Sequence, residues 1–448
     1  MSPKLYKIYK RSWYLKEKLL NKLTFAGRFT LVFSVIAAVF GINTYRTMLY
    51  QLFSLSFTLL VLAFLFSLRF RSKISVQRKL PETCTAGNLL RYQIIISNTD
   101  LLPEKGLFFK ENLTDPLPSF FEFDNTPEEG EEKRNRFDRW AGYYRWLWII
   151  RKNQGAILQE HALPMVEGKK RFSMSVSILP KRRGFIHFAS YTLFRHDPFG
   201  LVKSNITIPS AQNLLILPKI YPMLPFLFEG ARKYQQGGIA AAQSTGESTE
   251  FMALRDYRHG DQVKHIDWKS TIRTGKTVVR EYQDEYFSRY GLVLDTFSKS
   301  SFSQCFEEAV SVAASILMAN SPGDSILDLL FVGPDQCIKS SGKGIAEQRH
   351  MLEILASVET CKDKAFTELS DLLKQHIQLL SGLTIVFIDM DEPRKKLLEF
   401  LNAAKVPCKA MLIVESKKQG EEKITTVGLT LPILLLEVNN IKQGLDSL

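Results

Sequence analysis

Three aspartates follow short apolar runs, and carboxylates in such places can bind a divalent cation. Asp295 ends the run 291–295, and Asp389 ends the run 383–389 with Asp391 two residues later. The carboxyl ends of parallel strands meet at one edge of a sheet, and Mg²⁺ prefers oxygen ligands. One function class to consider is therefore a metal-dependent hydrolase or transferase that uses these aspartates. The chain offers no nucleophile–base pair for it, which counts against this class.

The densest group of polar side chains lies in residues 251–285, which we name the charged block. His259 with Asp261 and His265 with Asp267 repeat a histidine–aspartate spacing that can ligate a metal. No third histidine cluster follows, so we expect no metal in this block. The sequence Gly275-Lys276-Thr277 imitates the end of a phosphate-binding loop, but Ser270 occupies the position of that loop's first glycine.

Charges of opposite sign alternate through the charged block around two aromatic side chains. Buried or half-buried bases and acids in such a pattern pair with one another to avoid the cost of desolvation. The pattern therefore favours a structural network of ion pairs, and the alternative is a surface that recognises a partner. The residues concerned are Arg255, Asp256, Tyr257, Asp261, Asp267, Trp268, Arg273, Arg280 and Glu281.

The elements after the charged block predict an α/β domain. Apolar runs typical of buried strands alternate with segments of helical spacing, and this order is typical of a mostly parallel sheet with helices on both faces. We expect strands at 291–295, 326–332, 383–389, 408–414 and 431–438, and helices near 306–317 and at 344–358, 366–380 and 393–404.

The middle of the chain predicts a β-sandwich-like domain. Apolar and polar residues alternate in short runs bounded by turn residues, for example in 92–96 and 172–178. Residues 136–151 differ, because they hold three of the five tryptophans among several arginines. This aromatic segment is either an interfacial element on a bilayer or a strand or helix packed on the sandwich, and we favour packing.

Two apolar runs near the amino terminus predict a membrane hairpin with helices at 24–43 and 48–68. A helix needs about 20 residues to cross the hydrocarbon layer, and both runs come close to this length. Basic residues precede the first run and follow the second, with only Arg46 in the connection. By the positive-inside rule both termini face the cytoplasm of a bacterial inner membrane.

The charge distribution counts against a nucleic-acid binder. Residues 1–79 hold fourteen Lys or Arg and one acid, Glu17, whereas residues 80–448 hold 45 bases and 45 acids. A domain that grips phosphates normally carries its own positive field. The five cysteines are odd in number and far apart, so we expect free thiols and a reducing compartment.

Together these patterns divide the chain into six parts. They are a basic cytoplasmic leader (1–23), the membrane hairpin (24–69), the sandwich (70–220), a flexible linker (221–250), the charged block (251–285) and the α/β domain (286–448).

Nearly the whole chain resembles a membrane-anchored family of unknown function that is associated with MoxR-type AAA+ ATPases. The resemblance rests on a long signature in the charged block, on Arg182-Arg183-Gly184-Phe185 and Asp197-Pro198-Phe199-Gly200-Leu201 upstream, and on the two apolar runs. It implies that the α/β domain is von Willebrand factor A-like and that the chain binds an ATPase of this type. The signature positions are Arg255, Tyr257, Gly260, Asp261, Ile266, Asp267, Trp268, Arg273, Val279, Arg280 and Glu281.

The chain departs from that family's pattern at the metal site. The von Willebrand type A site uses Asp-x-Ser-x-Ser, and here Phe297 and Lys299 occupy the two serine positions after Asp295. We therefore expect a degenerate site at Asp295, Ser298 and Asp389, with Mg²⁺ as the only cofactor to consider. The function that we expect is a non-enzymatic scaffold in envelope maturation or stress tolerance, fixed to the membrane and binding a MoxR-type ATPase.

Overall fold

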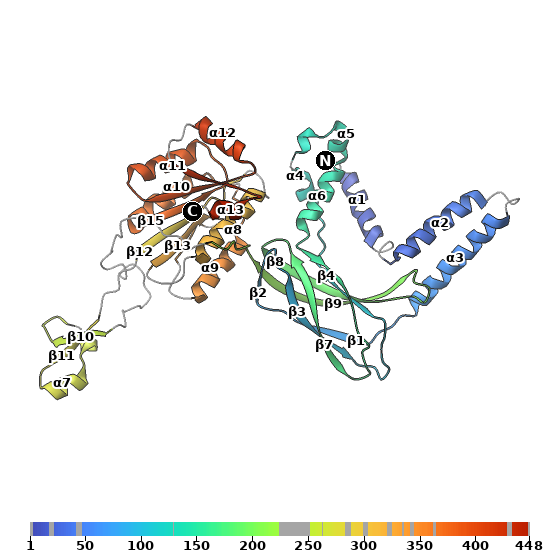
Figure 1. Cartoon of the computed structure of the whole chain (residues 1–448), viewed down its shortest axis with the longest axis horizontal. Coiled ribbons are helices and arrows are strands. Elements are labelled where there is room, and N and C mark those ends of the chain that lie inside the picture. Colours follow the sequence, from blue (N-terminus) through green and yellow to red (C-terminus); the bar gives the residue numbers. More distant parts are fainter. Residues whose placement is uncertain are drawn as a thin grey trace. The chain divides into compact units, whose positions relative to one another are not determined.

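The structure is a computed structural model of the chain. It describes residues 3–17, 22–41, 47–128, 130–223, 251–261, 263–282, 288–298, 303–319, 325–333, 336–340, 345–361, 364–427 and 432–446. The chain forms two units, Met1–Lys219 with Leu352–Val358 and Ile220–Met351 with Glu359–Leu448 (Figure 1). Most of the predicted linker, residues 224–250, lies outside the described residues.

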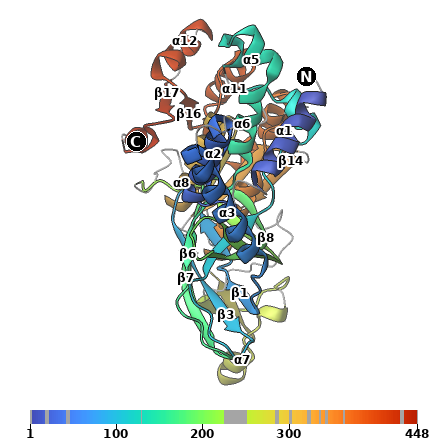
Figure 2. The ribbon, with the colours of Figure 1, turned by 90° about the vertical axis from the view of Figure 1, so that its right-hand side faces the viewer.

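Two apolar helices lie side by side in the first unit, α2 (Phe25–Gly41) and α3 (Thr47–Leu68) (Figures 1 and 2). The helices are close at Gly41, where an added Cβ would make an ordinary van der Waals contact with the Tyr50 backbone nitrogen at 3.5 Å. The stretch Met48–Leu68 is long and apolar enough to cross a membrane, and α2 is apolar but shorter. The large apolar side chains of both helices face outward, where lipid would favour them.

Two sheets follow and enclose a common apolar core. The order of strands is β1-β3-β7-β5 in one sheet and β2-β9-β8-β4-β6 in the other. The period-two prediction is confirmed in β3, where buried positions alternate with exposed or half-buried ones. The strands are β1 (Ile74–Lys79), β2 (Thr83–Thr85), β3 (Leu90–Asn98), β4 (Phe108–Leu113), β5 (Ala156–Leu158), β6 (Glu160–Ala162), β7 (Arg171–Pro180), β8 (Gly184–His196) and β9 (Lys203–Leu217).

A buried ion pair lies inside this core. Arg78 of β1 donates from Nε to both oxygens of Glu111 of β4, at 2.9 and 3.0 Å, and both side chains are almost fully buried. Tyr92 of β3 donates its hydroxyl to Glu111 at 2.7 Å, and Arg78 also donates to the Ser190 and Ser210 carbonyls. The pair therefore joins strands of both sheets.

The aromatic segment is helical and is inserted between β4 and β5. Its helices are α4 (Phe120–Asn125), η2 (Glu131–Lys133), α5 (Arg136–Ala141) and α6 (Tyr143–Asn153). The predicted packing on the sandwich is wrong in its partner, because Trp146 packs against Tyr6 and Tyr9 of α1 (Pro3–Leu15). The basic leader is thus an amphipathic helix whose aromatic face covers the insert.

The charged block forms a hairpin with a short helix in its connection. β10 (Phe251–Asp256) pairs antiparallel with β11 (Val278–Tyr282), and η3 (Val263–His265) and α7 (Trp268–Thr274) lie between them. Gly275 ends α7 in the left-handed conformation (φ 70°), which glycine adopts without strain.

The α/β domain has six strands in the order β14-β13-β12-β15-β16-β17. All neighbours are parallel except β14, which pairs antiparallel at one edge. The predicted parallel sheet is therefore present, and the sequence patterns missed β14, α12 and α13. The strands are β12 (Ser288–Leu294), β13 (Ser325–Val332), β14 (Gln336–Ser340), β15 (Gly382–Phe387), β16 (Cys408–Val414) and β17 (Ile433–Glu437).

Helices cover both faces of this sheet, so every residue of β15 is buried. Alternate residues of the strands form an apolar cluster with side chains of α10 and α11. Helix α8 contacts β12, β15 and β16, and its buried side chains do not belong to that cluster. The helices are α8 (Gln304–Ala319), α9 (Ile345–Ser357), α10 (Thr367–His376), η4 (Ile377–Leu379), α11 (Glu392–Ala403), α12 (Lys417–Val427) and α13 (Ile441–Leu445).

Candidate functional site

Asp295 lies directly after β12, at the strand end where the sequence predicts it, and it is fully buried. Arg394 of α11 binds it with two hydrogen bonds, from Nε to one oxygen at 2.8 Å and from Nη2 to the other at 3.1 Å. The backbone N–H groups of Phe297 and Ile388 donate to the same carboxylate. Both carboxylate oxygens therefore already have donors from within the protein.

The arginine itself is held on several sides. It is 4% exposed, and its remaining N–H groups reach the Asp391 carboxylate at 2.7 Å and the Phe297 carbonyl at 3.1 Å. The Phe366 ring lies 4.7 Å from the guanidinium carbon. A guanidinium with these partners stays charged and fixed in one orientation.

Burial and the Arg394 guanidinium shift the pKa of Asp295 in opposite directions. Complete burial raises the pKa of this carboxyl group, while Arg394 and the two backbone N–H groups oppose the rise. The neighbouring Asp391 accepts from the Arg394 backbone N–H and caps the amino terminus of α11.

Asp389 belongs to a separate ion pair. Lys423 of α12 donates to it at 2.5 Å, and both side chains are about half exposed. Partial burial would raise the pKa of Asp389, but the Lys423 ammonium and the Met390 N–H outweigh burial and lower it. Asp295 and Asp389 thus bind different cationic side chains of the chain.

In the part of the chain that the structure describes, Asp295 and Asp389 of the predicted metal site already bind side chains of the protein. No group of three or more His, Cys, Asp or Glu side chains lies together in the part of the chain that the structure describes. Ser298 is half-buried after Phe297, and residues 299–302 lie outside the described residues. A hydrolase or transferase that used Asp295, Asp389 and Asp391 on a metal would first have to displace Arg394 and Lys423.

The first ion pair of the charged block closes the connection after β10. Arg255 donates two parallel hydrogen bonds to Asp261, at 2.7 and 2.8 Å, and the Arg258 backbone N–H donates to the same carboxylate. These donors lower the pKa of Asp261 to about 2. Gly260 precedes Asp261 with a φ of 106°, a conformation that side chains other than hydrogen disfavour.

The second ion pair holds α7 on the hairpin. Asp267 caps α7 by accepting from the Ser270 N–H at 3.0 Å, and its other oxygen accepts from Arg280 Nε of β11 at 2.7 Å. The Ser270 N–H and then Arg280 lower the pKa of Asp267. Four of the predicted signature residues therefore pair with each other, as the ion-pair interpretation expects.

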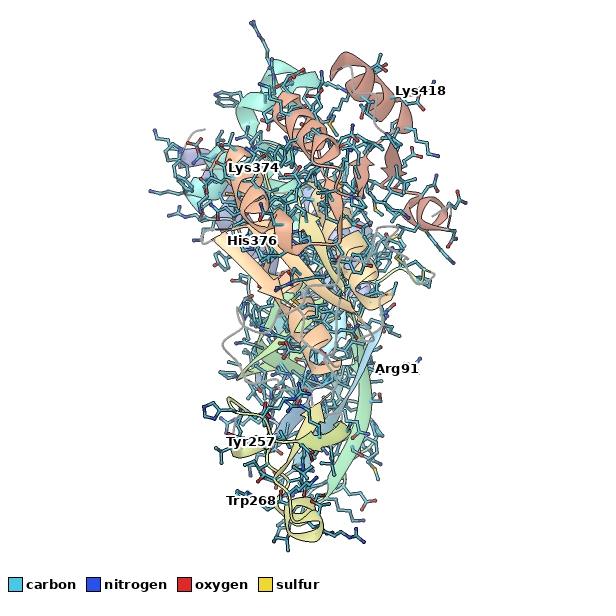
Figure 3. All side chains as sticks on the ribbon, turned by 90° about the vertical axis from the view of Figure 1, so that its left-hand side faces the viewer. Arg91, Tyr257, Trp268, Lys374, His376 and Lys418 are labelled. Carbon is cyan, nitrogen blue, oxygen red and sulfur yellow. The ribbon has the colours of Figure 1, made fainter. Side chains whose placement is uncertain are left out.

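Of the remaining signature residues, Val279 is buried and Ile266 is half-buried beside it, whereas the others that the structure describes with side chains lie on the surface of the charged block. Trp268 is 60% exposed and Tyr257 is 37% exposed, and Figure 3 labels both. Ile272, Val263 and Leu254 are also exposed on the block. Arg273 is exposed beside this apolar group, and Glu281 is described only through its backbone pairing with Ala253. Trp268 and Ile272 are four residues apart on α7 and therefore share one side of that helix, and we name these two exposed side chains the apolar face.

Sequence reasoning missed the two buried arginines. Arg394 lies in the first turn of a helix 99 positions from the aspartate that it binds, and no local spacing marks it. A signal did exist, because Phe297 and Lys299 already counted against a metal at Asp295. Arg78 lies on an alternating strand at a position of the core face, where a charged residue requires a partner.

The fold and the site together define a class of protein, with at least one apolar helix fit for a membrane, a β-rich domain and an α/β domain with a closed strand-end carboxylate. A model of the family described as "Protein of unknown function DUF58" matches residues 253–431, which begin in the charged block and cover most of the α/β domain. "Uncharacterized protein YeaD" of Bacillus subtilis is 27% identical over 190 residues.

The two matches support a family of unknown function. The YeaD alignment covers 42% of this chain and 46% of the relative, so the chain spans about half the length of the curated relative that it matches. Two structures of a CARDB domain from Pyrococcus furiosus, one with di-metal ions, align with 32% of the chain and 94% and 93% of their own length. The identities are 10% and 8% and the TM-scores are 0.18 and 0.17.

Proposed function

We propose that this chain is a membrane-anchored interaction protein whose charged block binds a protein partner through its apolar face. The proposal rests on two groups of side chains in the block, which have different roles. Its two acid–base pairs hold the hairpin and α7 together, while Trp268 and Ile272 of α7 point outward. Exposed tryptophan on an internally fixed scaffold is typical of interaction hot spots.

The partner that we propose is a MoxR-type AAA+ ATPase, on the strength of the family resemblance. The charge around the apolar face adds one requirement for the partner. Asp261 and Asp267 are engaged with arginines of the block and Asp256 is an exposed acid, whereas four bases are exposed, Arg258, Lys269, Arg273 and Lys276. The complementary surface on the ATPase is therefore apolar at its centre and acidic at its rim.

The α/β domain acts in this proposal as a von Willebrand factor A-like domain without metal chemistry. The strand order with an antiparallel edge strand supports that assignment, since it is the order of a doubly wound sheet with the switch point beside β12. Asp295 stands at this switch point, where a ligand would bind, and Arg394 fills the position of a cation. The domain thus serves binding and not hydrolysis.

Membrane anchoring by both α2 and α3, with both termini in the cytoplasm, completes the proposal. The basic residues on either side of the hairpin and the outward-facing apolar side chains of both helices support it. The bacterial cytoplasmic membrane is then the place where the partner is recruited.

The test uses the full-length protein in nanodiscs and a purified MoxR-type ATPase of the same organism, with binding measured by biolayer interferometry. The variant Trp268→Ser with Ile272→Ser should weaken binding at least about tenfold, because both side chains would be buried in the complex. The control Leu89→Ser removes a side chain that is 50% exposed on the sandwich and should leave the affinity unchanged. Equal affinity of all three proteins, or no binding by any, would refute the proposal.

A further inference from the structure

The tip of the β8–β9 hairpin, residues 197–202, packs against the two apolar helices. Leu201 and Val202 are buried in a cluster with Ala63, and Leu23, Leu59 and Leu60 complete it. The ring of Phe199 meets that of Phe66 edge to face, with centroids 6.1 Å apart. Thus the far end of a long sandwich hairpin lies alongside the candidate membrane helices, and Figure 1 shows it there.

The contact with α2 is equally close. A Cβ at Gly27 would lie 2.0 Å from the Leu201 carbonyl oxygen, so only glycine permits it. Thr24 donates its backbone N–H to that oxygen at 3.0 Å and its hydroxyl to the Gly200 carbonyl at 2.6 Å. Gly27 on α2 and Ala63 on α3 therefore mark the level on the helices at which the tip binds.

The helix lengths place this level inside the membrane. At about 1.5 Å per residue, the helices rise only about 21 Å from Gly41 to Gly27 and about 24 Å from Thr47 to Ala63. The hydrocarbon layer is about 30 Å thick. If the connection between the helices lies at the far surface, the hydrocarbon extends roughly 6 to 9 Å beyond the level of the tip.

The apolar surface of the helices continues past the same level. Phe25 is 87% exposed on α2, and Phe66 and Leu68 are 50% and 65% exposed on α3. These side chains lie at or beyond the level of Gly27 and Ala63, and the protein does not cover them. Lipid would cover them at the depth that the helix lengths require.

The tip is built for a place of low polarity. Residues 198–202 carry no charge, and Pro198 and Phe199 are exposed. The carboxylate of Asp197 accepts the backbone N–H groups of Phe199 and Val202, at 2.9 and 2.6 Å, and the Gly200 N–H bonds the Asp197 carbonyl. These internal bonds satisfy backbone groups that water would otherwise have to solvate.

We propose that the tip of the β8–β9 hairpin inserts into the cytoplasmic leaflet beside α2 and α3 and is a third membrane-binding element of the protein. Its occupant is the boundary between phospholipid headgroups and acyl chains, which takes up Phe199 and Pro198. The proposal rests on the membrane anchoring proposed above. Its consequence is that the sandwich is held on the membrane at two places, by the chain at Leu68 and by the tip.

The experiment measures the depth of labels on the full-length protein in phospholipid vesicles. Bimane is attached to Phe199→Cys, Phe185→Cys or Leu62→Cys in a background whose five native cysteines are replaced by alanine. Quenching by lipids with a nitroxide at acyl carbon 5 is compared with quenching by aqueous iodide. Phe185 is the matched control, because it is 59% exposed at the opposite end of β8, and Leu62 on α3 reports on anchoring itself.

The label at position 199 should be quenched by the lipid nitroxide at least threefold more than the label at 185, and iodide should show the reverse order. Quenching at 62 without quenching at 199 would overturn the insertion of the tip and leave the anchor standing. Absence of lipid quenching at 62 would overturn the anchor, and the tip with it. A signal at 199 equal to that at 185 would likewise refute the proposal.

Discussion

Replacing Arg394 by methionine should strongly destabilise the centre of the α/β domain. Asp295 would lose both hydrogen bonds from the guanidinium and keep only those from Phe297 and Ile388. Hydrogen bonds to charged groups contribute about 1.5–3 kcal/mol each, and breaking one side of a buried ion pair costs about 3–5 kcal/mol. We expect a loss of about 3–5 kcal/mol in the free energy of opening, because methionine leaves a buried carboxylate without its cation.

Hydrogen exchange of the full-length protein in nanodiscs, read by mass spectrometry, measures this loss where it arises. Peptides of β15 and α11 should lose about two to four orders of magnitude of protection. The matched control is Lys423→Met, which removes a half-exposed pair with Asp389 and should cost less than about 1 kcal/mol. Arg394→Lys keeps the charge without the two parallel bonds, so it should fall between the two.

The loss in Arg394→Met should also depend on pH. Without its cation the buried Asp295 carboxyl has a pKa raised further above the unfolded value of about 3.9. Between the two pKa values the native state holds more protons than the unfolded state, so stability falls as pH rises, by at most about 1.4 kcal/mol per unit. The variant should therefore be closer to the wild type at pH 5 than at pH 8. A pH-independent deficit below 1 kcal/mol would refute the assignment of Arg394 as the cation of this site.

Three further predictions concern the rest of the molecule. Glu111→Gln should cost about 3–5 kcal/mol in thermal unfolding of the full-length protein, because Arg78 stays buried without its carboxylate; unchanged unfolding would contradict this. Gly27→Val should cost about 1–3 kcal/mol by overpacking, read as a lower aggregation temperature in detergent, and equality with the wild type would place the hairpin tip elsewhere. By NMR titration Asp261 should show a pKa near 2, which Arg255→Gln should raise toward 3.8; an ordinary value in the parent protein would show that the pair does not form.

The sequence predicted the elements whose patterns are local. Alternation predicted β3, and the apolar runs predicted the parallel strands that carry Asp295 and Asp389 at their ends. The predicted ranges 24–43 and 48–68 hold the apolar helices α2 (Phe25–Gly41) and α3 (Thr47–Leu68), of which one is long enough to be a possible span. Each of these predictions depends on a hydrophobic period or on an apolar run, and both are set by residues that are neighbours in the sequence.

The aromatic segment shows where periodicity failed. Phe137, Trp140, Tyr144 and Leu147 have the spacing of one helical face, but the first three side chains are exposed, and Trp146 and Ile149 are buried instead. The reason is tertiary, because α1 supplies the partner surface from more than a hundred residues away. Two short amphipathic helices are only marginally stable alone, so the face that each buries depends on how they pack against each other.

The charged block and the strand-end site differ in what their ion pairs do. In the charged block the sequence left structural pairing and partner recognition open, and at the strand end it left open whether the aspartates bind a metal. At Asp295 the pair is buried and closed, so the carboxylate at that edge of the sheet binds an arginine that the chain itself provides. In the charged block Asp267 caps the helix that carries the exposed Trp268 and pairs with Arg280, so pairing there does not compete with the partner binding that we propose. A buried ion pair stabilises the fold and is closed to a ligand, whereas a half-exposed pair can hold an apolar face in place for a partner.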